Sequence, residues 1–208
     1  MTQITAYTDG SATTFHPYLG GFGIYFPQGN IRIKKGWSHT KTGRQELYAV
    51  LYCLRSIKNK QAKVTIYSDS QYVCNTVNEW IEGWERNMWY DKKNVDILKQ
   101  LLIELRKFAY YPKLIHIKGH QEVTCKHTEG NSIVDHLADY RHHSSYEVDV
   151  MPTGLNEIEK QDYFEKDRKM YLKPDLYQIT KKNKNKTYKE INDFMDSKDC
   201  DATEIDIY

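Results

Sequence analysis

The sequence predicts an α/β domain built on a five-stranded mixed sheet with flanking helices, followed by a C-terminal extension. Three strand patterns separated by short turns come before the first helical pattern, which indicates an antiparallel meander. Two later strand patterns alternate with helical patterns, which indicates parallel strands reached by helical crossovers. Beyond about residue 147 the apolar periodicity weakens and prolines interrupt it. We therefore expect a folded domain at 1–146 and an extension at 147–208.

The first half of the domain is expected to form three strands and a helix. Residues 4–9 alternate in hydrophobicity and end in Asp9-Gly10, which is typical of a strand that runs into a turn. Residues 20–26 and 30–37 are the next two strand patterns. The helical pattern that follows has apolar residues at helical spacing: Leu47, Val50, Leu51, Leu54 and Ile57.

The second half is expected to form two strands and three helical stretches. A fourth strand at 63–69 precedes helical patterns at 71–86 and 95–109. A fifth strand at 114–118 and a last helix at 131–144 complete the domain. This order of elements predicts that the first and fourth strands lie side by side and parallel.

The composition indicates a cytoplasmic protein with a core of its own. A hydrophobic fraction of 39% argues against wholesale disorder, and a net charge of +2 argues against nucleic-acid binding through bulk charge. The four cysteines form no C-x-x-C pair, which argues against a disulfide framework or a thiolate metal site. The sequence shows no signal-peptide pattern and no stretch long enough for a membrane span, so we expect no contact with a membrane.

The extension is strongly charged. A Lys/Asn-rich run at 181–189 precedes an acidic end at 193–206. Charge blocks of opposite sign favour a solvated tail, partly helical or disordered, over a second module. These residues do not indicate a partner for the tail.

Four acidic residues are expected to meet at one edge of the sheet. Asp9 and Asp69 each end a predicted strand, and the carboxyl ends of adjacent parallel strands share an edge. Glu46 and Asp135 are each expected in the first turn of a helix that begins near that edge. Each acid alone has an ordinary explanation, because Asp is common in turns and acids suit a helix's first turn.

The four acids together favour a metal site over these ordinary explanations. Carboxylates that crowd one another repel and raise one another's pKa, so a shared site needs a compensating charge. Hard divalent cations such as Mg²⁺ take oxygen ligands, and pairs of such ions are commonly used to cut phosphodiesters.

Motifs over about residues 1–145 resemble those of the type 1 ribonuclease H family, which cuts the RNA strand of RNA–DNA hybrids. The motifs occur in the family's order. They are Tyr7-Thr8-Asp9-Gly10-Ser11, Gly20-Gly21-Phe22-Gly23, Arg44-Gln45-Glu46-Leu47, Ser68-Asp69-Ser70-Gln71-Tyr72-Val73, Trp80-Ile81-x-x-Trp84, Asn94-Val95-Asp96, Lys118-Gly119-His120 and Asn131-x-x-x-Asp135-x-Leu137-Ala138.

The resemblance implies a ribonuclease H-like fold and a metal-dependent endonuclease. Two Mg²⁺ ions would serve a two-metal hydrolysis that leaves 5′-phosphate and 3′-hydroxyl ends, and Mn²⁺ would also suit oxygen ligands. The ligands that the family pattern assigns are Asp9, Glu46, Asp69 and Asp135.

The resemblance also implies a loop histidine that assists proton transfer or product release. His120 falls at that position, and a histidine can change charge at working pH. His127 lies in the same segment, which is longer than usual for the family. His120 is favoured because it directly follows Lys118-Gly119, and an exposed loop histidine without a role is the alternative.

Substrate-binding residues follow from the same resemblance. Tyr72 and Trp80 would line a channel for the DNA strand, and Lys41, Thr42 and Asn94 would grip a DNA phosphate. The basic protrusion of bacterial relatives is shortened here, which bears on affinity more than on chemistry. The enzyme is expected to act on its hybrid as a monomer.

Three other functions use the same fold. A DNA-directed nuclease is disfavoured by the matches at Tyr72, Trp80 and Asn94. A binding module without turnover is disfavoured by the complete set of four acids. A detached reverse transcriptase domain is the weakest alternative, because Met1 stands one strand before the first motif.

Overall fold

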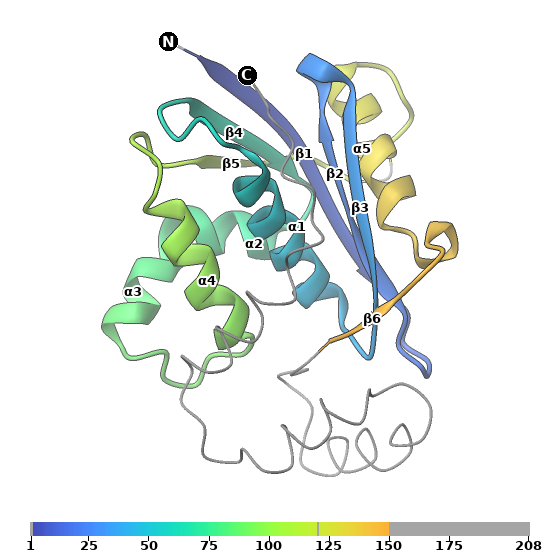
Figure 1. Ribbon diagram of the computed structural model, residues 1–208, viewed down its shortest axis with the longest axis horizontal. Helices are drawn as coiled ribbons and strands as arrows, with labels where there is room; N and C mark the ends of the chain where they lie inside the picture. The colour runs from blue at the N-terminus through green and yellow to red at the C-terminus, as the bar shows by residue number, and fades with distance from the viewer. Residues whose placement is uncertain (1, 120, 150–208) are drawn as a thin grey trace.

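A computed structural model describes residues 2–119 and 121–149 of the chain. These residues form one mixed sheet of six strands in the order β5-β4-β1-β2-β3-β6, with helices on both faces (Figure 1). The predicted α/β class is confirmed. The structure adds one strand to the five that were expected.

The first three strands form the predicted antiparallel meander. They are β1 (Gln3–Ala12), β2 (Gly20–Phe26) and β3 (Ile31–Ser38). The strands β4 (Lys63–Ser68) and β5 (Lys113–His116) extend the sheet on the other side of β1 and run parallel to it. The expected parallel neighbours, the first and fourth strands, are thus confirmed.

The sixth strand, β6 (Glu147–Val148), pairs in parallel with β3. It consists of two residues, which is too short for an alternating pattern to be recognised. It lies in the region that was expected to be an extension, so residues 147–149 pack on the sheet. Residues 150–208 lie outside the described residues.

The helices cover the sheet unequally (Figure 1). On one side lie α1 (Thr42–Ser56), α2 (Gln71–Asn75), α3 (Ile81–Arg86) and α4 (Val95–Leu105), with a π-helical turn at Thr76–Trp80 between α2 and α3. On the other side lies α5 (Lys126–Ala138). Short 3-10 turns occupy Pro27–Gly29 and Tyr140–His142.

The core lies between α1 and the sheet. Leu47, Val50, Leu51 and Leu54 of α1 are fully buried, as their helical spacing predicted. Burial of large aliphatic side chains contributes roughly 1.5–3 kcal/mol each. This packing fixes α1 on β1 and thereby fixes the start of the helix, which carries Glu46.

A buried ion-pair network ties the end of the described chain to the start of α1. The Arg44 guanidinium donates to both carboxylate oxygens of Asp149, at 2.6 and 2.7 Å, and to both of Asp96, at 3.0 and 2.7 Å. Thr40 Oγ1 donates to Asp149 Oδ2 at 2.8 Å. All three charged side chains are at most 5% exposed, so the pairing is needed to offset their desolvation.

Across the described ranges, no helix combines the length and the apolar character that crossing a membrane would require.

Candidate active site

Asp9 and Asp69 are the first residues beyond the point where β1 and β4 stop pairing. The last parallel pair is Thr8 with Ser68, so both aspartates leave the shared ladder at the same edge. The expectation that Asp9 ends its strand was wrong, because β1 continues to Ala12 and pairs Asp9 with Gly23 of β2. The edge forms because β1 and β4 stop pairing after Thr8 and Ser68 although β1 itself continues.

Glu46 approaches the same edge from α1. It lies in the second turn of the helix rather than in the expected first turn, because α1 begins at Thr42. A Cβ at Gly10 would overlap Glu46 N, so only a glycine lets β1 approach α1 this closely. Ser70 Oγ donates to Glu46 Oε2 at 2.7 Å. Burial raises the pKa of Glu46 to about 7, with a further increase from the Asp69 charge, although the Ser70 hydrogen bond lowers it.

Asp135 comes from the opposite face of the sheet, on α5. The predicted helix at 131–144 is shifted, because α5 spans Lys126–Ala138 and Asp135 therefore lies near its end and not in its first turn. The helix starts early because Cys125 and Thr128 form a capping box there. It stops early because Asp139 turns the chain, its carboxylate accepting from Arg141 N at 2.9 Å.

The four acids are close enough to influence one another's ionisation. Burial raises the pKa of Asp9 to about 7, with further increases from the charges of Asp69, Asp135 and Glu46. The Gly10 backbone N–H donates to Asp9 Oδ1 at 2.8 Å and opposes this increase. The charges of the other three acids that the sequence singled out thus all act on Asp9.

The acids suit a hard divalent cation by their chemistry. Among residues 2–119 and 121–149, no three His, Cys, Asp or Glu side chains are grouped as a metal site as they lie. However, burial and then the neighbouring negative charges raise the pKa of Asp9, and a divalent cation would favour its charged form. Carboxylate oxygens are the donors that Mg²⁺ prefers.

The loop after β5 lies against Asp69. The His116 ring nitrogen Nε2 hydrogen-bonds the Asp69 backbone oxygen at 3.1 Å. A Cβ at Gly119 would overlap the Asp69 carboxylate, so the loop backbone closes directly on this acid. His120, the predicted loop histidine, lies outside the described residues. Its alternative, His127, lies in the first turn of α5, where its Nδ1 is 2.9 Å from the Tyr7 hydroxyl.

The predicted substrate-binding residues fall into three places. Tyr72 hydrogen-bonds Asn94, which adopts a left-handed backbone conformation at the start of α4. Lys41 and Thr42 stand at the start of α1, where Thr42 is exposed. Trp80 is 36% exposed, and its ring centroid is 5.6 Å from that of Trp84.

Two contributions to the site were missed in the sequence. Ser70 was quoted only as part of a motif, although a serine before a helix is a recognisable cap, and here it also holds Glu46. Asp149 was assigned to the extension, yet it fixes Arg44, which stands two residues before Glu46 on α1. No periodic pattern in the sequence indicates that an isolated acidic residue such as Asp149 is buried.

Comparison with known proteins identifies related sequences. The sequence model of the RNase H family matches residues 1–142. A ribonuclease H of Pseudoalteromonas atlantica is 41% identical over 108 residues, which cover 49% of this chain and 69% of the relative. A ribonuclease HI of Helicobacter pylori is 34% identical over 122 residues, which cover 58% of this chain and 82% of the relative.

A solved structure shares the fold. The solution structure of the prototype foamy virus RNase H domain superposes with a TM-score of 0.53 at 26% identity, covering 65% of this chain and 92% of that domain.

Proposed function

The chain belongs to the type 1 ribonuclease H family of enzymes, and from this premise we propose that it hydrolyses the RNA strand of RNA–DNA hybrids. The observation that carries the proposal is the convergence of Asp9, Glu46, Asp69 and Asp135 from both faces of the sheet, expressed in the raised pKa of Asp9. Such crowding destabilises the site unless a cation binds there.

The chemistry we propose is a two-metal-ion hydrolysis. Two Mg²⁺ ions held by the four carboxylates would supply a water of lowered pKa and positive charge for the leaving 3′ oxygen, giving 5′-phosphate and 3′-hydroxyl ends. Mn²⁺ would serve the same donors. The chain's own part is to hold the ligands in place. Ser70 orients Glu46, and the Gly10 amide orients Asp9 and favours its ionised form.

We assign His120 a role in proton transfer or product release. It directly follows Gly119, whose backbone lies against the Asp69 carboxylate, and this position in the sequence supports the role. His127 is a weaker candidate, because it is engaged with Tyr7.

The substrate would be held through its DNA strand. Lys41, Thr42 and Asn94 would bind a DNA phosphate, and Tyr72 and Trp80 would contact the strand beside it. The Tyr72–Asn94 hydrogen bond supports this grouping, because it joins two of the proposed contacts. Partly exposed aromatic rings such as Trp80 suit stacking against sugars or bases.

The proposal includes a monomeric enzyme in the cytoplasm. The thiols of Cys53, Cys74 and Cys125 are free, as expected for a reducing compartment.

The test compares labelled RNA–DNA hybrid, duplex RNA and duplex DNA, each incubated with the full chain and Mg²⁺. We expect cleavage of the RNA strand of the hybrid alone, with 5′-phosphate ends. Asp69→Asn should abolish cleavage and leave hybrid binding intact. Preferential cleavage of duplex DNA would instead identify a DNA-directed nuclease, and unchanged cleavage by Asp69→Asn would refute the site.

A further inference from the structure

Three alternate residues of β1 face α5 and interact with it. Side chains at alternate positions of a strand point to the same face of the sheet, so Tyr7, Asp9 and Ser11 lie on one face. Tyr7 hydrogen-bonds His127 in the first turn of α5, and Ser11 hydrogen-bonds the Ala138 carbonyl at its end. Between these contacts, Asp9 pairs with Gly23 of β2, which lies directly against α5 at Val134, one residue before Asp135.

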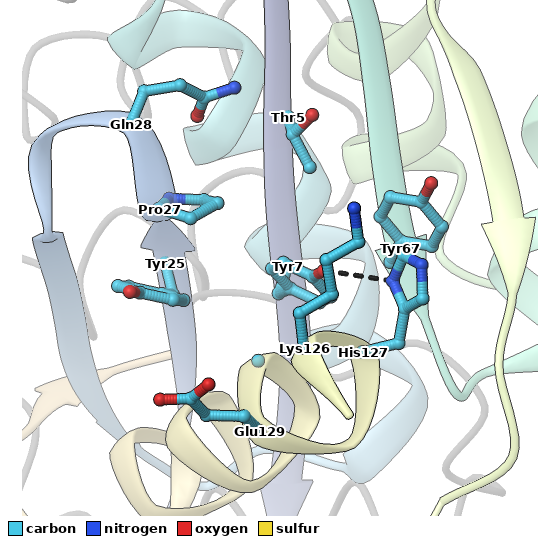
Figure 2. Close-up of a pocket in the computed structure, with 10 residues that line it drawn as sticks. Thr5, Tyr7, Tyr25, Pro27, Gln28, Tyr67, Lys126, His127 and Glu129 are labelled. Carbon is cyan, nitrogen blue, oxygen red and sulfur yellow. Dashed lines mark hydrogen bonds between the residues drawn. The ribbon is translucent and has the colours of Figure 1, made fainter. Parts of the chain in front are cut away.

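The first contact joins Tyr7, which is buried, to His127, which is partly buried. The Tyr7 hydroxyl and His127 Nδ1 are 2.9 Å apart, as the dashed line in Figure 2 shows. The His127 ring also packs on Tyr67, with ring centroids 4.5 Å apart.

The second contact and two glycines hold the helix directly on the strands. Ser11 Oγ donates to the Ala138 carbonyl at 2.8 Å. A Cβ at Gly130 would lie 2.6 Å from the Tyr7 ring, and a Cβ at Gly23 would lie 2.5 Å from the Val134 carbonyl. Because no side chain separates α5 from the sheet at these points, the helix backbone lies directly against β1 and β2.

The order of these groups is the same on both elements. Along β1 it is Tyr7, Asp9, Ser11, and along α5 it is His127, Asp135, Ala138, so one hydrogen bond lies on each side of the Asp9–Asp135 pair. We propose that these two hydrogen bonds set the separation of Asp9 and Asp135, which makes Tyr7, His127 and Ser11 positioning residues for metal binding. The inference rests on the proposed function of the four acids.

The alternative is that the Tyr7–His127 contact only stabilises the fold. The two roles differ in what they change. A structural contact affects the melting temperature, whereas a positioning contact changes metal affinity while the fold and the hybrid affinity stay the same. Divalent ions such as Mg²⁺ demand nearly ideal ligand geometry, so a displaced carboxylate should weaken binding.

The first test uses Tyr7→Phe, which removes the hydroxyl and keeps the ring. Mn²⁺ binding to the full chain is measured by calorimetry, and the Mg²⁺ dependence of hybrid cleavage is measured in parallel. We expect several-fold weaker Mn²⁺ binding and a several-fold higher half-saturating Mg²⁺ concentration, with the KM for hybrid unchanged. Tyr67→Phe, in the neighbouring ring, is the matched control and should behave as wild type.

The second test uses the cavity beside His127. The ring borders an open cavity of about 380 Å³, whose floor is formed by Tyr7, Tyr25 and Tyr67 (Figure 2). His127→Ala should show the same loss of metal affinity as Tyr7→Phe. Added imidazole should enter the vacated space and restore Mg²⁺-dependent cleavage in His127→Ala, but not in the Tyr7→Phe, His127→Ala double variant.

The outcomes separate the inference from the proposed function. Wild-type Mn²⁺ binding by Tyr7→Phe would overturn the positioning role, and so would a His127→Ala defect that imidazole leaves unchanged. A wild-type chain that binds Mn²⁺ but does not cleave hybrid would refute the proposed function. The comparison of Mn²⁺ affinities would still decide the positioning role in that case.

Discussion

Ser70 Oγ donates a 2.7 Å hydrogen bond to Glu46 Oε2, and this bond lowers the pKa of a carboxyl group that burial raises to about 7. Ser70→Ala should therefore raise the pKa of Glu46 further and leave less of it ionised at neutral pH. A hydrogen bond to a charged group contributes roughly 1.5–3 kcal/mol, and one pKa unit corresponds to about 1.4 kcal/mol. We expect the acidic limb of the pH–rate profile to move up by about one to two pH units.

Ser70→Thr is the control for this prediction, because it keeps the hydroxyl group. Ser70 also caps α2 through Val73 N, so both variants should first be compared by thermal unfolding. An acidic limb that Ser70→Ala leaves in place would mean that Glu46 does not limit the reaction at low pH.

The crowded carboxylates should make the metal-free protein less stable as the pH rises. The pKa of Asp9 is about 7 in the folded chain against an ordinary value of 3.8. Between these values the folded state holds a proton that the unfolded state has lost, so stability falls as pH increases through this window. The Asp9→Asn variant has no ionisable group at position 9. In the presence of a chelator at pH 8, this variant should be more stable than wild type by about 1–2 kcal/mol, which corresponds to a melting temperature higher by roughly 2–8 °C.

The difference between Asp9→Asn and wild type should disappear at low pH, where Asp9 is protonated. Added Mg²⁺ at pH 8 should raise the melting temperature of wild type and leave that of Asp9→Asn nearly unchanged. A constant difference at both pH values would contradict an ionisation effect.

Gly119 should be indispensable for activity although it carries no functional group. Any side chain there would overlap the Asp69 carboxylate and displace either the acid or the loop. A displacement of about 1 Å can reduce catalysis by about 10²-fold, so we expect a loss of this order in kcat for Gly119→Ala, with a near-normal melting temperature. Gly83→Ala is the control, since its nearest neighbour would be 3.9 Å away. Normal kcat in Gly119→Ala would show that the loop adapts.

The Arg44–Asp149 pair should be a main determinant of stability. Asp149→Asn removes the charge that offsets a buried guanidinium, and breaking a buried pair costs about 3–5 kcal/mol. Urea unfolding should show this loss. Glu147→Gln serves as the control, because the Lys35–Glu147 pair is partly exposed and should contribute less than about 1 kcal/mol. Equal losses of unfolding free energy in the two variants would contradict the larger contribution expected of the buried pair.

The sequence was most informative where periodic patterns and connection rules apply. The spacing of Leu47, Leu51 and Leu54 predicted the buried face of α1, and the order of strands and helical crossovers placed Asp9 beside Asp69. These two inferences account for most of the sheet and for three of the four acids at its edge. Each depends on many residues that agree with one another.

The features that were missed depend on single long-range pairs or on unusual caps. Asp149 reaches Arg44 from 105 positions away, and neither residue carries a pattern that names its partner. The start of α5 depends on Cys125 and Thr128, five residues before the predicted start at 131, and cysteine is not among the residues that usually cap a helix. The contact between Tyr7 and His127 follows from that earlier start, so it could not be predicted either.

Removal of residues 150–208 should weaken hybrid binding without unfolding the domain. The shortened chain keeps Asp149 and its pairing with Arg44, so its melting temperature should stay close to that of the full chain. It loses the Lys-rich run at 181–189, which we propose replaces part of the missing basic protrusion. Each lost phosphate contact should reduce the slope of log affinity against log salt by about 0.9. A chain ending at residue 192 keeps the run, lacks the acidic end and should bind at least as well as the full chain. Equal salt slopes for all three chains would refute this role of the tail.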